Sequence, residues 1–293
     1  MMMEPVKPDA SDCCGQGCRR CVFDVYEEEL KIWRKQTTPT DPVDYNNSMS
    51  PEHYMQCEIV KVIAQCDDVS IYQFKLPDKS LLHFTAGQHL MARELTDNGA
   101  VCRPYTIVSR PGNVAKFSIL IKTYAEGVMS QLIATKWTEG YRVWWRGPFG
   151  ECDYQANSRR NVILIAAGTG IAPVYQIAKQ IVANEEEETF VKLIYCCKSY
   201  ESILLREKLN RLTTFWNFKS RYVLSHQEGQ VERIKKHDEN VHCGQLNEDL
   251  LRKELVGLSR LADSRIFVCG SQTFETDIGN YLKRLNLENI VTF

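Results

Sequence analysis

Hydrophobic and polar positions follow two different patterns along the chain. Between positions 57 and 149, short runs of strand-forming residues alternate with turns, and one helix is expected near Gly127 to Leu132. Short strands without long helices between them predict a small antiparallel barrel. The expected strands are Glu58–Ala64, Ser70–Leu76, His89–Arg93, Pro104–Val108, Phe117–Lys122 and Tyr141–Trp145.

After Asn161, apolar runs alternate with amphipathic helical segments. Continuous apolar strands with crossover helices are typical of a doubly wound parallel sheet. The expected fold is therefore an antiparallel β-barrel followed by a nucleotide-binding α/β domain. The predicted strands are Val162–Ala166, Val191–Tyr195, Tyr222–Leu224, Ile266–Val268 and Ile290–Phe293, and the predicted helices are Pro173–Ala183, Leu204–Leu212, Leu246–Leu255 and Phe274–Leu285.

The N-terminal part of the chain follows neither pattern. Apolar residues at helical spacing predict one short amphipathic helix over Val22–Arg34. Proline and asparagine make Thr37–Pro51 typical of a linker. We therefore expect a cysteine-rich segment with its linker at 1–50, a barrel at 51–155 and an α/β domain at 156–293.

Composition is that of an ordinary globular protein. The 293 residues suffice for two domains with separate cores, and the net charge of -1 gives no attraction to nucleic acid. We find no run of about 18 apolar residues that would span a bilayer, and no secretory signal. The 12 cysteines then indicate reduced thiols within a cell. We expect a protein that is cytoplasmic or peripheral to an intracellular membrane, without a transmembrane segment or a nucleic-acid partner.

A glycine-rich turn joins the first apolar strand of the second half to its helix. Gly168, Thr169 and Gly170 would let the backbone approach a pyrophosphate, and the helix N-terminus would supply N–H groups. Pro173 suits a first helical turn, although it stands near the third glycine of the usual dinucleotide motif. The turn indicates a nicotinamide nucleotide; the alternative is a tight turn without a ligand.

A cation, an aromatic ring and a hydroxyl group follow one another along a predicted barrel strand. Side chains at Arg103 and Tyr105 share one face, so the arginine can pair with phosphate while the tyrosine packs on a ring system. A helix opening at Gly127 offers backbone N–H groups to a second phosphate. An Arg-Pro-Tyr run alone is more often an ordinary strand. Its combination with Gly127–Ser130 favours a flavin nucleotide.

In this order, the motifs resemble those of the NADH–cytochrome b5 reductases, within the ferredoxin–NADP reductase superfamily. The resemblance covers positions 57–293, roughly four-fifths of the chain. It implies a flavin-binding barrel followed by a pyridine-nucleotide domain. The matching motifs are Arg-x-Tyr-Thr/Ser at Arg103–Thr106, Gly-x-Met-Ser at Gly127–Ser130, Gly-Pro-x-Gly at Gly147–Gly150, Gly-Thr-Gly-Ile-x-Pro at Gly168–Pro173 and Cys-Gly at Cys269–Gly270.

The resemblance also implies a role for each motif. In the barrel, Tyr105 would lie against the isoalloxazine of FAD, and Thr106 would hydrogen-bond near N5, the atom that receives hydride. Cys269 would lie close to the nicotinamide ring, which makes Thr106 and Cys269 the candidate catalytic residues. The other candidate cofactor-binding residues are Arg103, Pro104, Ile121, Lys122, Tyr124, Gly127, Val128, Met129 and Ser130 for FAD, and Gly168, Thr169, Gly170, Pro173 and Gly270 for the nicotinamide nucleotide.

The implied activity is hydride transfer from NADH to FAD, followed by transfer of single electrons to a heme protein such as cytochrome b5. Arg142 and Arg146 are candidates for a basic docking face, with ordinary surface charge as the alternative. Two positions depart from the family. Ser271–Phe274 replaces prolines after Cys-Gly, and Ser202 stands where the family has an acidic residue, with Glu201 one position earlier. A carboxylate there would bind the ribose 2′-hydroxyl, so NADH is expected over NADPH.

The N-terminal cysteines remain open. Cys13, Cys18 and Cys21 have the C-x4-C-x2-C spacing of plant-type ferredoxin loops, and Cys14 precedes a glycine. The stretch resembles a short "oxidoreductase-like" N-terminal domain. Reduced thiols are expected; zinc or an iron–sulfur centre serving another acceptor is the alternative, and no metal ligand is assigned. A non-catalytic nucleotide-binding module is a third interpretation of the chain. The acidic run at 185–188 is expected to be a solvated loop.

Overall fold

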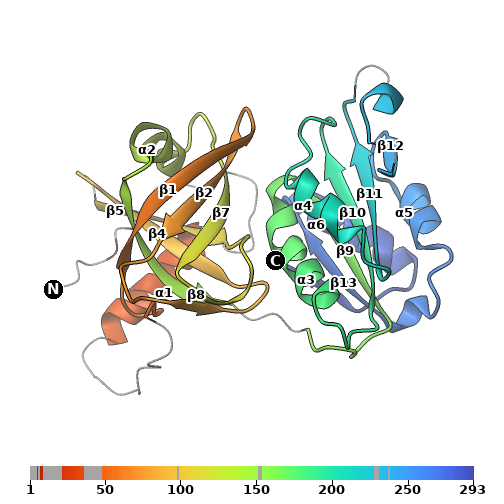
Figure 1. The fold of residues 1–293 in the computed structure, drawn as a ribbon, viewed down its shortest axis with the longest axis horizontal. Coiled ribbons are helices and arrows are strands. Elements are labelled where there is room, and N and C mark those ends of the chain that lie inside the picture. The colour runs from red at the N-terminus through yellow and green to blue at the C-terminus, as the bar shows by residue number, and fades with distance from the viewer. Residues whose placement is uncertain are drawn as a thin grey trace. The chain divides into compact units, whose positions relative to one another are not determined.

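The computed structural model describes residues 5, 7, 8, 22–35, 48–97, 99–150, 154–227, 231–236 and 238–293. The chain divides into two compact units, Met1–Cys152 and Asp153–Phe293, which are described separately below (Figure 1). The cysteines between positions 13 and 21 and the expected linker up to position 47 lie outside the described residues. In the part that is described, no helix is both long and apolar enough to cross a membrane.

The first unit is built on an antiparallel sheet, as predicted. Its strands pair in the order β5-β4-β8-β1-β2-β7, and an isolated bridge between Ile107 and Ile119 links the end of β5 to β7. This bridge brings the two edges of the sheet together as in a barrel. The strands are β1 (Met55–Cys66), β2 (Val69–Lys75), β4 (His89–Thr96), β5 (Gly99–Thr106), β7 (Lys116–Lys122) and β8 (Arg142–Phe149), with α2 (Val128–Lys136) after β7 and a small sheet of β3 (Leu82–Phe84) and β6 (Gly112–Val114).

Aromatic side chains fill the interior of the barrel. Phe74 stacks on Phe117 with ring centroids 5.1 Å apart, and Trp145 meets Phe74 edge-on at 4.9 Å. The buried carboxylate of Glu94 accepts hydrogen bonds from the indole of Trp137 at 2.7 Å and from the hydroxyl of Tyr141 at 3.0 Å. Burial, together with Glu94, raises the pKa of Tyr141 to about 12. Both polar partners of Glu94 therefore stay neutral donors that fix the interior.

The predicted N-terminal helix is present as α1 (Val22–Lys35) and belongs to the first unit. It packs against β5, and its buried residue Val25 joins a small cluster with Met91 and Cys102. The helix therefore covers part of the barrel.

The second unit contains the predicted parallel sheet. Its strands pair in the order β12-β11-β10-β9-β13-β14. Helices α5 and α6 share one hydrophobic core on the sheet, while α3 and α4 pack together, as expected of a doubly wound fold. The elements are β9 (Asn161–Ala167), α3 (Ile171–Val182), β10 (Phe190–Cys197), α4 (Arg206–Leu212), β11 (Phe218–Leu224), β12 (Val241–Cys243), α5 (Glu248–Leu255), β13 (Ser264–Cys269), α6 (Gln272–Arg284) and β14 (Ile290–Thr292), with single-turn helices at Gly168–Gly170, Val231–Arg233 and Leu261–Asp263.

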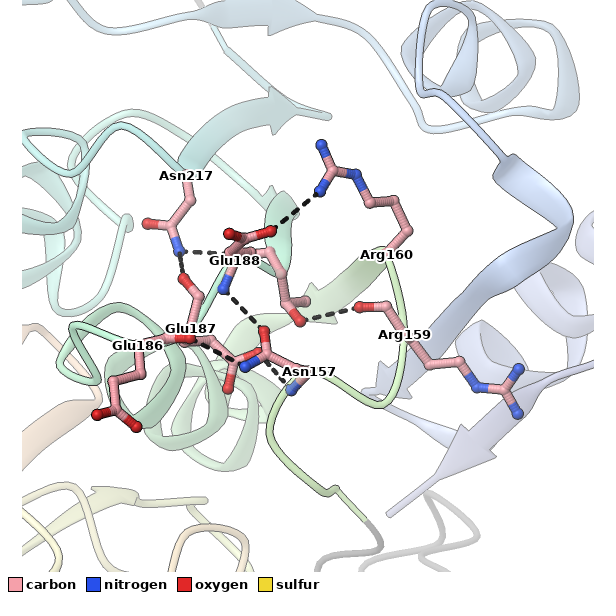
Figure 2. A network of polar contacts seen from close by, with 8 residues as sticks. Asn157, Arg159, Arg160, Glu186, Glu187, Glu188 and Asn217 are labelled. Atoms are coloured by element: carbon pink, nitrogen blue, oxygen red, sulfur yellow. Dashed lines mark hydrogen bonds and ion pairs between the residues drawn. The ribbon is translucent and has the colours of Figure 1, made fainter.

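The acidic run at 185–188 is not simply a solvated loop. Glu187 is only 3% exposed and accepts hydrogen bonds from the hydroxyl of Tyr154 at 2.8 Å and the backbone N–H of Asn157 at 2.7 Å. The Asn157 side chain bridges the carbonyl of Glu186 and the N–H of Glu188 (Figure 2). The expectation was wrong at Glu187, because its carboxylate satisfies polar groups of the segment that leads into β9.

Candidate functional site

Strand β5 carries the motif predicted to bind the flavin. Arg103 pairs with Ala92 and Tyr105 with Leu90 of β4, and both partners lie in the barrel core. Arg103 and Tyr105 therefore share the inner face of the strand, while Cys102 and Pro104 share the outer face. Burial raises the pKa of Tyr105 well above its usual range, so its hydroxyl stays neutral. Thr106 lies at the end of the strand and is half-buried.

Helix α2 is in contact with this strand. Among the described residues, no side chain caps the helix at its N-cap Gly127, and no acidic residue occupies its first turn. The N–H groups of Val128, Met129 and Ser130 belong to the first turn, which has no partners within the helix. An added Cβ at Gly127 would meet the Ser130 hydroxyl at 3.0 Å. The positive N-terminal end of α2 and the guanidinium of Arg103 together suit the negative charge of a pyrophosphate.

The candidate FAD-binding residues Ile121, Lys122 and Tyr124 also make contacts within the barrel, and their predicted role stays a prediction. Ile121 is buried in the barrel core. The ammonium of Lys122 lies 3.3 Å from the Asp68 carboxylate and 5.3 Å from the ring centroid of Tyr124. Burial opposes ionisation of Asp68, but hydrogen bonds from Cys66 and Lys122 outweigh it and lower the pKa of Asp68. Asp68, in the β1–β2 turn, carries no motif that would have revealed it.

The glycine-rich turn lies where the strand order changes direction. Strand β9 has β10 on one side and β13 on the other, so the carboxyl ends of β9 and β13 are adjacent, with Ala166 opposite Cys269. In open α/β sheets, ligands bind at such a switch point. Gly168 has a φ of +54°, and an added Cβ there would meet nothing within 4 Å. Space for a ligand therefore remains beside Gly168.

Gly170 is constrained by the protein itself. A Cβ on Gly170 would lie 2.3 Å from the carbonyl oxygen of Cys269. The start of α3 thus touches the backbone at the end of β13, and only glycine fits between them. Pro173 lies in the first turn of α3, as predicted. The hydroxyl of Tyr195 donates to the carbonyl of Gly168 at 2.9 Å, a support that sequence reasoning missed because Tyr195 stands on an apolar strand.

The residues that replace the family's prolines after Cys269–Gly270 form the start of helix α6. The Ser271 hydroxyl accepts a hydrogen bond from the N–H of Phe274 at 3.3 Å and so caps α6, which begins at Gln272. The N–H of Gly270 donates to the carboxylate of Glu275 at 3.2 Å. The helix therefore begins directly after the Cys-Gly pair, and Cys269 stays half-buried at the strand end.

Ser202, which stands where the family has an acidic residue for the ribose 2′-hydroxyl, lies in a turn. The Ser202 hydroxyl accepts from the N–H of Ser199 at 2.9 Å and donates to its carbonyl at 2.8 Å, while Glu201 is exposed. Buried Glu239 accepts from the hydroxyl of Tyr200 and lies 3.8 Å from the Arg206 guanidinium. Glu201 is therefore the exposed carboxylate beside this turn, and the preference for NADH over NADPH stays a prediction.

Arg142 and Arg146, the two candidates for a docking face, differ in their exposure to solvent. Arg142 is exposed and pairs with Glu58 at 3.5 Å. Arg146 is only 3% exposed and donates to the carbonyl of Pro51 at 2.7 Å. A docking role for Arg146 is therefore wrong, because a buried side chain is not available to a partner surface. The described residues also contain no group of three or more His, Cys, Asp or Glu that could hold a metal ion.

Three protein-family models match the chain. The oxidoreductase FAD-binding domain matches residues 56–154, and the oxidoreductase NAD-binding domain matches residues 164–279. The oxidoreductase-like protein N-terminal model matches residues 2–41. The first two matches fall on the barrel and on the parallel sheet.

Among curated proteins, the chain is 36% identical over 290 residues to "NADH-cytochrome b5 reductase-like" of Homo sapiens, covering 96% of this chain and 91% of that protein. The Mus musculus protein of that name is 33% identical over 293 residues, covering 96% and 92%. In fold, the chain resembles the cytochrome b5 reductase domain of Ulva prolifera nitrate reductase, with a TM-score of 0.72 and 22% identity over 84% of this chain and 100% of that chain. The protein therefore belongs to the NADH-cytochrome b5 reductase family and is an oxidoreductase with an FAD-binding and an NAD-binding domain.

Proposed function

We propose that the protein takes hydride from NADH onto FAD and passes the electrons singly to a heme protein of the cytochrome b5 type. FAD supplies the redox chemistry, because a flavin accepts two electrons together and can release them one at a time. The observation that carries the proposal is that Arg103 lies on β5, the strand that α2 contacts, and that no side chain caps the N-terminus of α2. The names of the relatives support the heme acceptor.

In this proposal the protein binds and orients the cofactors. Arg103 and the N–H groups of Val128, Met129 and Ser130 hold the FAD pyrophosphate, while Tyr105 and Thr106 contact the flavin ring. The turn at Gly168–Gly170 and the start of α3 hold the pyrophosphate of NADH, and Cys269 contacts the nicotinamide. Neutral Tyr105 suits its role, because a negative phenolate beside the flavin would oppose its reduction.

The visible spectrum of the purified protein tests the function. We expect flavin absorption bands that bleach when NADH is added without oxygen, followed by reduction of added cytochrome b5. Ferricyanide is the matched acceptor that needs no protein docking. Bleaching and ferricyanide reduction without cytochrome b5 reduction would overturn the acceptor and keep the flavin. Additional sulfur-to-iron bands would reveal a cluster, and a colourless protein that takes up no FAD would contradict the proposal entirely.

Replacing Arg103 with alanine should weaken FAD binding by about ten- to a hundredfold, since a charge-assisted hydrogen bond contributes about 1.5–3 kcal/mol. The measurement is a titration of FAD into apoprotein followed by flavin fluorescence. Arg142→Ala is the matched control, because Arg142 is an exposed arginine of the same unit whose ion pair with Glu58 faces solvent. Equal FAD affinity in the Arg103 variant and the wild type would contradict the phosphate role.

A further inference from the structure

Helix α1 covers the outer face of the strand that carries Arg103. Val25 of α1 is 3% exposed and packs with Met91 of β4 and Cys102 of β5, beside Tyr54 and Phe149. Neighbouring β4 residues Leu90 and Ala92 belong instead to the interior core. Because side chains alternate across a strand, the cluster with α1 lies on the opposite face from the barrel interior.

Because side chains alternate along β5, its two faces contact different parts of the first unit. Cys102 faces α1, and the next residue, Arg103, shares the inner face with Val101 and Tyr105, which pack on the barrel core. The guanidinium of Arg103 donates to the carbonyl of Cys102 at 2.7 Å. The arginine is therefore bonded to the backbone of the same residue that α1 covers.

Strand β5 is an edge strand in the strand order of the sheet. It stands at one end of the strand order and has β4 as its one ladder partner in the described sheet, apart from the isolated bridge at Ile107. A strand paired on one side is held less firmly than a central strand. Helix α1 supplies packing at this edge, next to the residues that position the arginine.

Aromatic and cationic side chains surround the contact between Val25 and Cys102. The hydroxyl of Tyr54 lies 3.4 Å from the sulfur of Cys102. The guanidinium of Arg93, which pairs with Cys102 across the strands, lies 3.8 Å from the Tyr54 ring centroid and 5.4 Å from that of Trp144. Aromatic and cationic groups thus enclose the cluster, and Val25 closes it from the helix side.

We propose that α1 is a positioning element for FAD binding, which acts through the packing of Val25 on Cys102 and so on the placement of Arg103. The proposal rests on the proposed role of Arg103 at the FAD pyrophosphate. It assigns a task to part of the oxidoreductase-like N-terminal match at residues 2–41, within which α1 lies. The segment is then a support of the flavin site, whatever its cysteines do.

The test uses full-length protein and the dissociation constant of FAD. We expect Val25→Ala to weaken FAD binding severalfold and Val25→Asp to weaken it by about tenfold or more, because a buried charge would release the helix. Val25→Ile should restore affinity close to that of the wild type. Phe23→Ala is the matched control, since Phe23 is an apolar residue of the same helix that is 36% exposed. Near-ultraviolet circular dichroism of the barrel tryptophans checks that each variant is folded.

A double-mutant cycle separates the possible failures. If α1 acts through Arg103, Val25→Ala should add little once Arg103→Ala is present. If Arg103→Ala leaves FAD affinity unchanged, the proposed phosphate role is wrong. If Arg103→Ala weakens binding and Val25→Ala matches the wild type, the positioning role of α1 is overturned. Full additivity of the two effects would also overturn it, because α1 would then stabilise the barrel without acting on the arginine.

Discussion

Replacing Glu254 with glutamine should lower the free energy of unfolding of the second unit by about 3 kcal/mol. The Glu254 side chain is 4% exposed on α5, and its two oxygens lie 2.7 Å from the ammonium of Lys192 on β10 and 2.7 Å from the guanidinium of Arg221 on β11. Losing the carboxylate leaves two cations side by side against the sheet. The value is at the low end for a buried pair, because Arg221 keeps some contact with solvent.

The stability that Glu254 contributes to the fold should be lost at low pH. Burial opposes its ionisation, but the hydrogen bonds from Lys192 and Arg221 outweigh this and lower the pKa of Glu254 below its usual 4.5. A depressed carboxyl pKa stabilises the fold above the unfolded pKa, and that stability is lost as pH falls through the folded pKa. The difference in unfolding free energy between wild type and Glu254→Gln should therefore be constant from neutral pH to about 5 and shrink below it.

Glu248 provides the control for Glu254 within the same helix. Its carboxylate pairs with Arg252 at 3.3 Å and Arg284 at 2.6 Å, but both arginine side chains are more than half exposed. Exposed pairs contribute at most about 1 kcal/mol, so Glu248→Gln should have a small effect. Chemical denaturation at several pH values measures both variants. Equal losses for the two would contradict the argument from burial.

Most of the fold could be predicted because its strands carry strong periodic patterns. The strands β9, β10 and β13 are apolar runs bounded by turns, and the structure has them where they were expected. The short strands β3, β6 and β12 were missed, since each has only three residues with a polar residue at its centre and so forms no continuous apolar run. The strand β8 continues through Gly147 and Pro148 to Phe149, beyond the expected end of the strand at Trp145.

Only those parts of the candidate site that are formed by consecutive residues could be predicted from the sequence. The motif at Arg103–Thr106 and the turn at Gly168–Gly170 can be recognised because consecutive residues form them. Supporting contacts join residues far apart, such as Tyr195 with Gly168, 27 positions away, and Glu187 with Tyr154, 33 positions away. No pattern within the sequence marks such pairs, because the fold alone brings them together. The same reason explains why Arg146 was taken for a surface residue.

Gly170→Ala should weaken NADH binding by about tenfold or more and lower the stability of the second unit by about 3 kcal/mol. Gly170 has ordinary helical angles, with φ of −59° and ψ of −10°, so alanine would suffer no backbone strain there. Its Cβ would instead lie 2.3 Å from the Cys269 oxygen and 3.0 Å from the nitrogen of Gly270. Backbone atoms cannot rotate away, so the start of α3 must separate from β13. Overpacking of this kind costs about 1–3 kcal/mol, and a misplacement of about 1 Å can reduce turnover a hundredfold.

Two glycines separate this steric effect from other consequences of adding a methyl group. Gly279 lies within α6 with nothing within 4 Å of an added Cβ, so Gly279→Ala should stabilise the unit by up to about 1 kcal/mol. Gly168→Ala has equal space but requires φ of +54°, so it should cost about 1–2 kcal/mol from backbone strain alone. The Michaelis constant for NADH and the unfolding free energy are measured for all three variants. If Gly170→Ala matched Gly168→Ala in both, the contact between α3 and β13 would not be what requires glycine. If its effect is larger, the Gly168–Gly170 turn and the Cys269–Gly270 strand end act as one packed unit, in which the residues proposed to hold the nucleotide also hold each other.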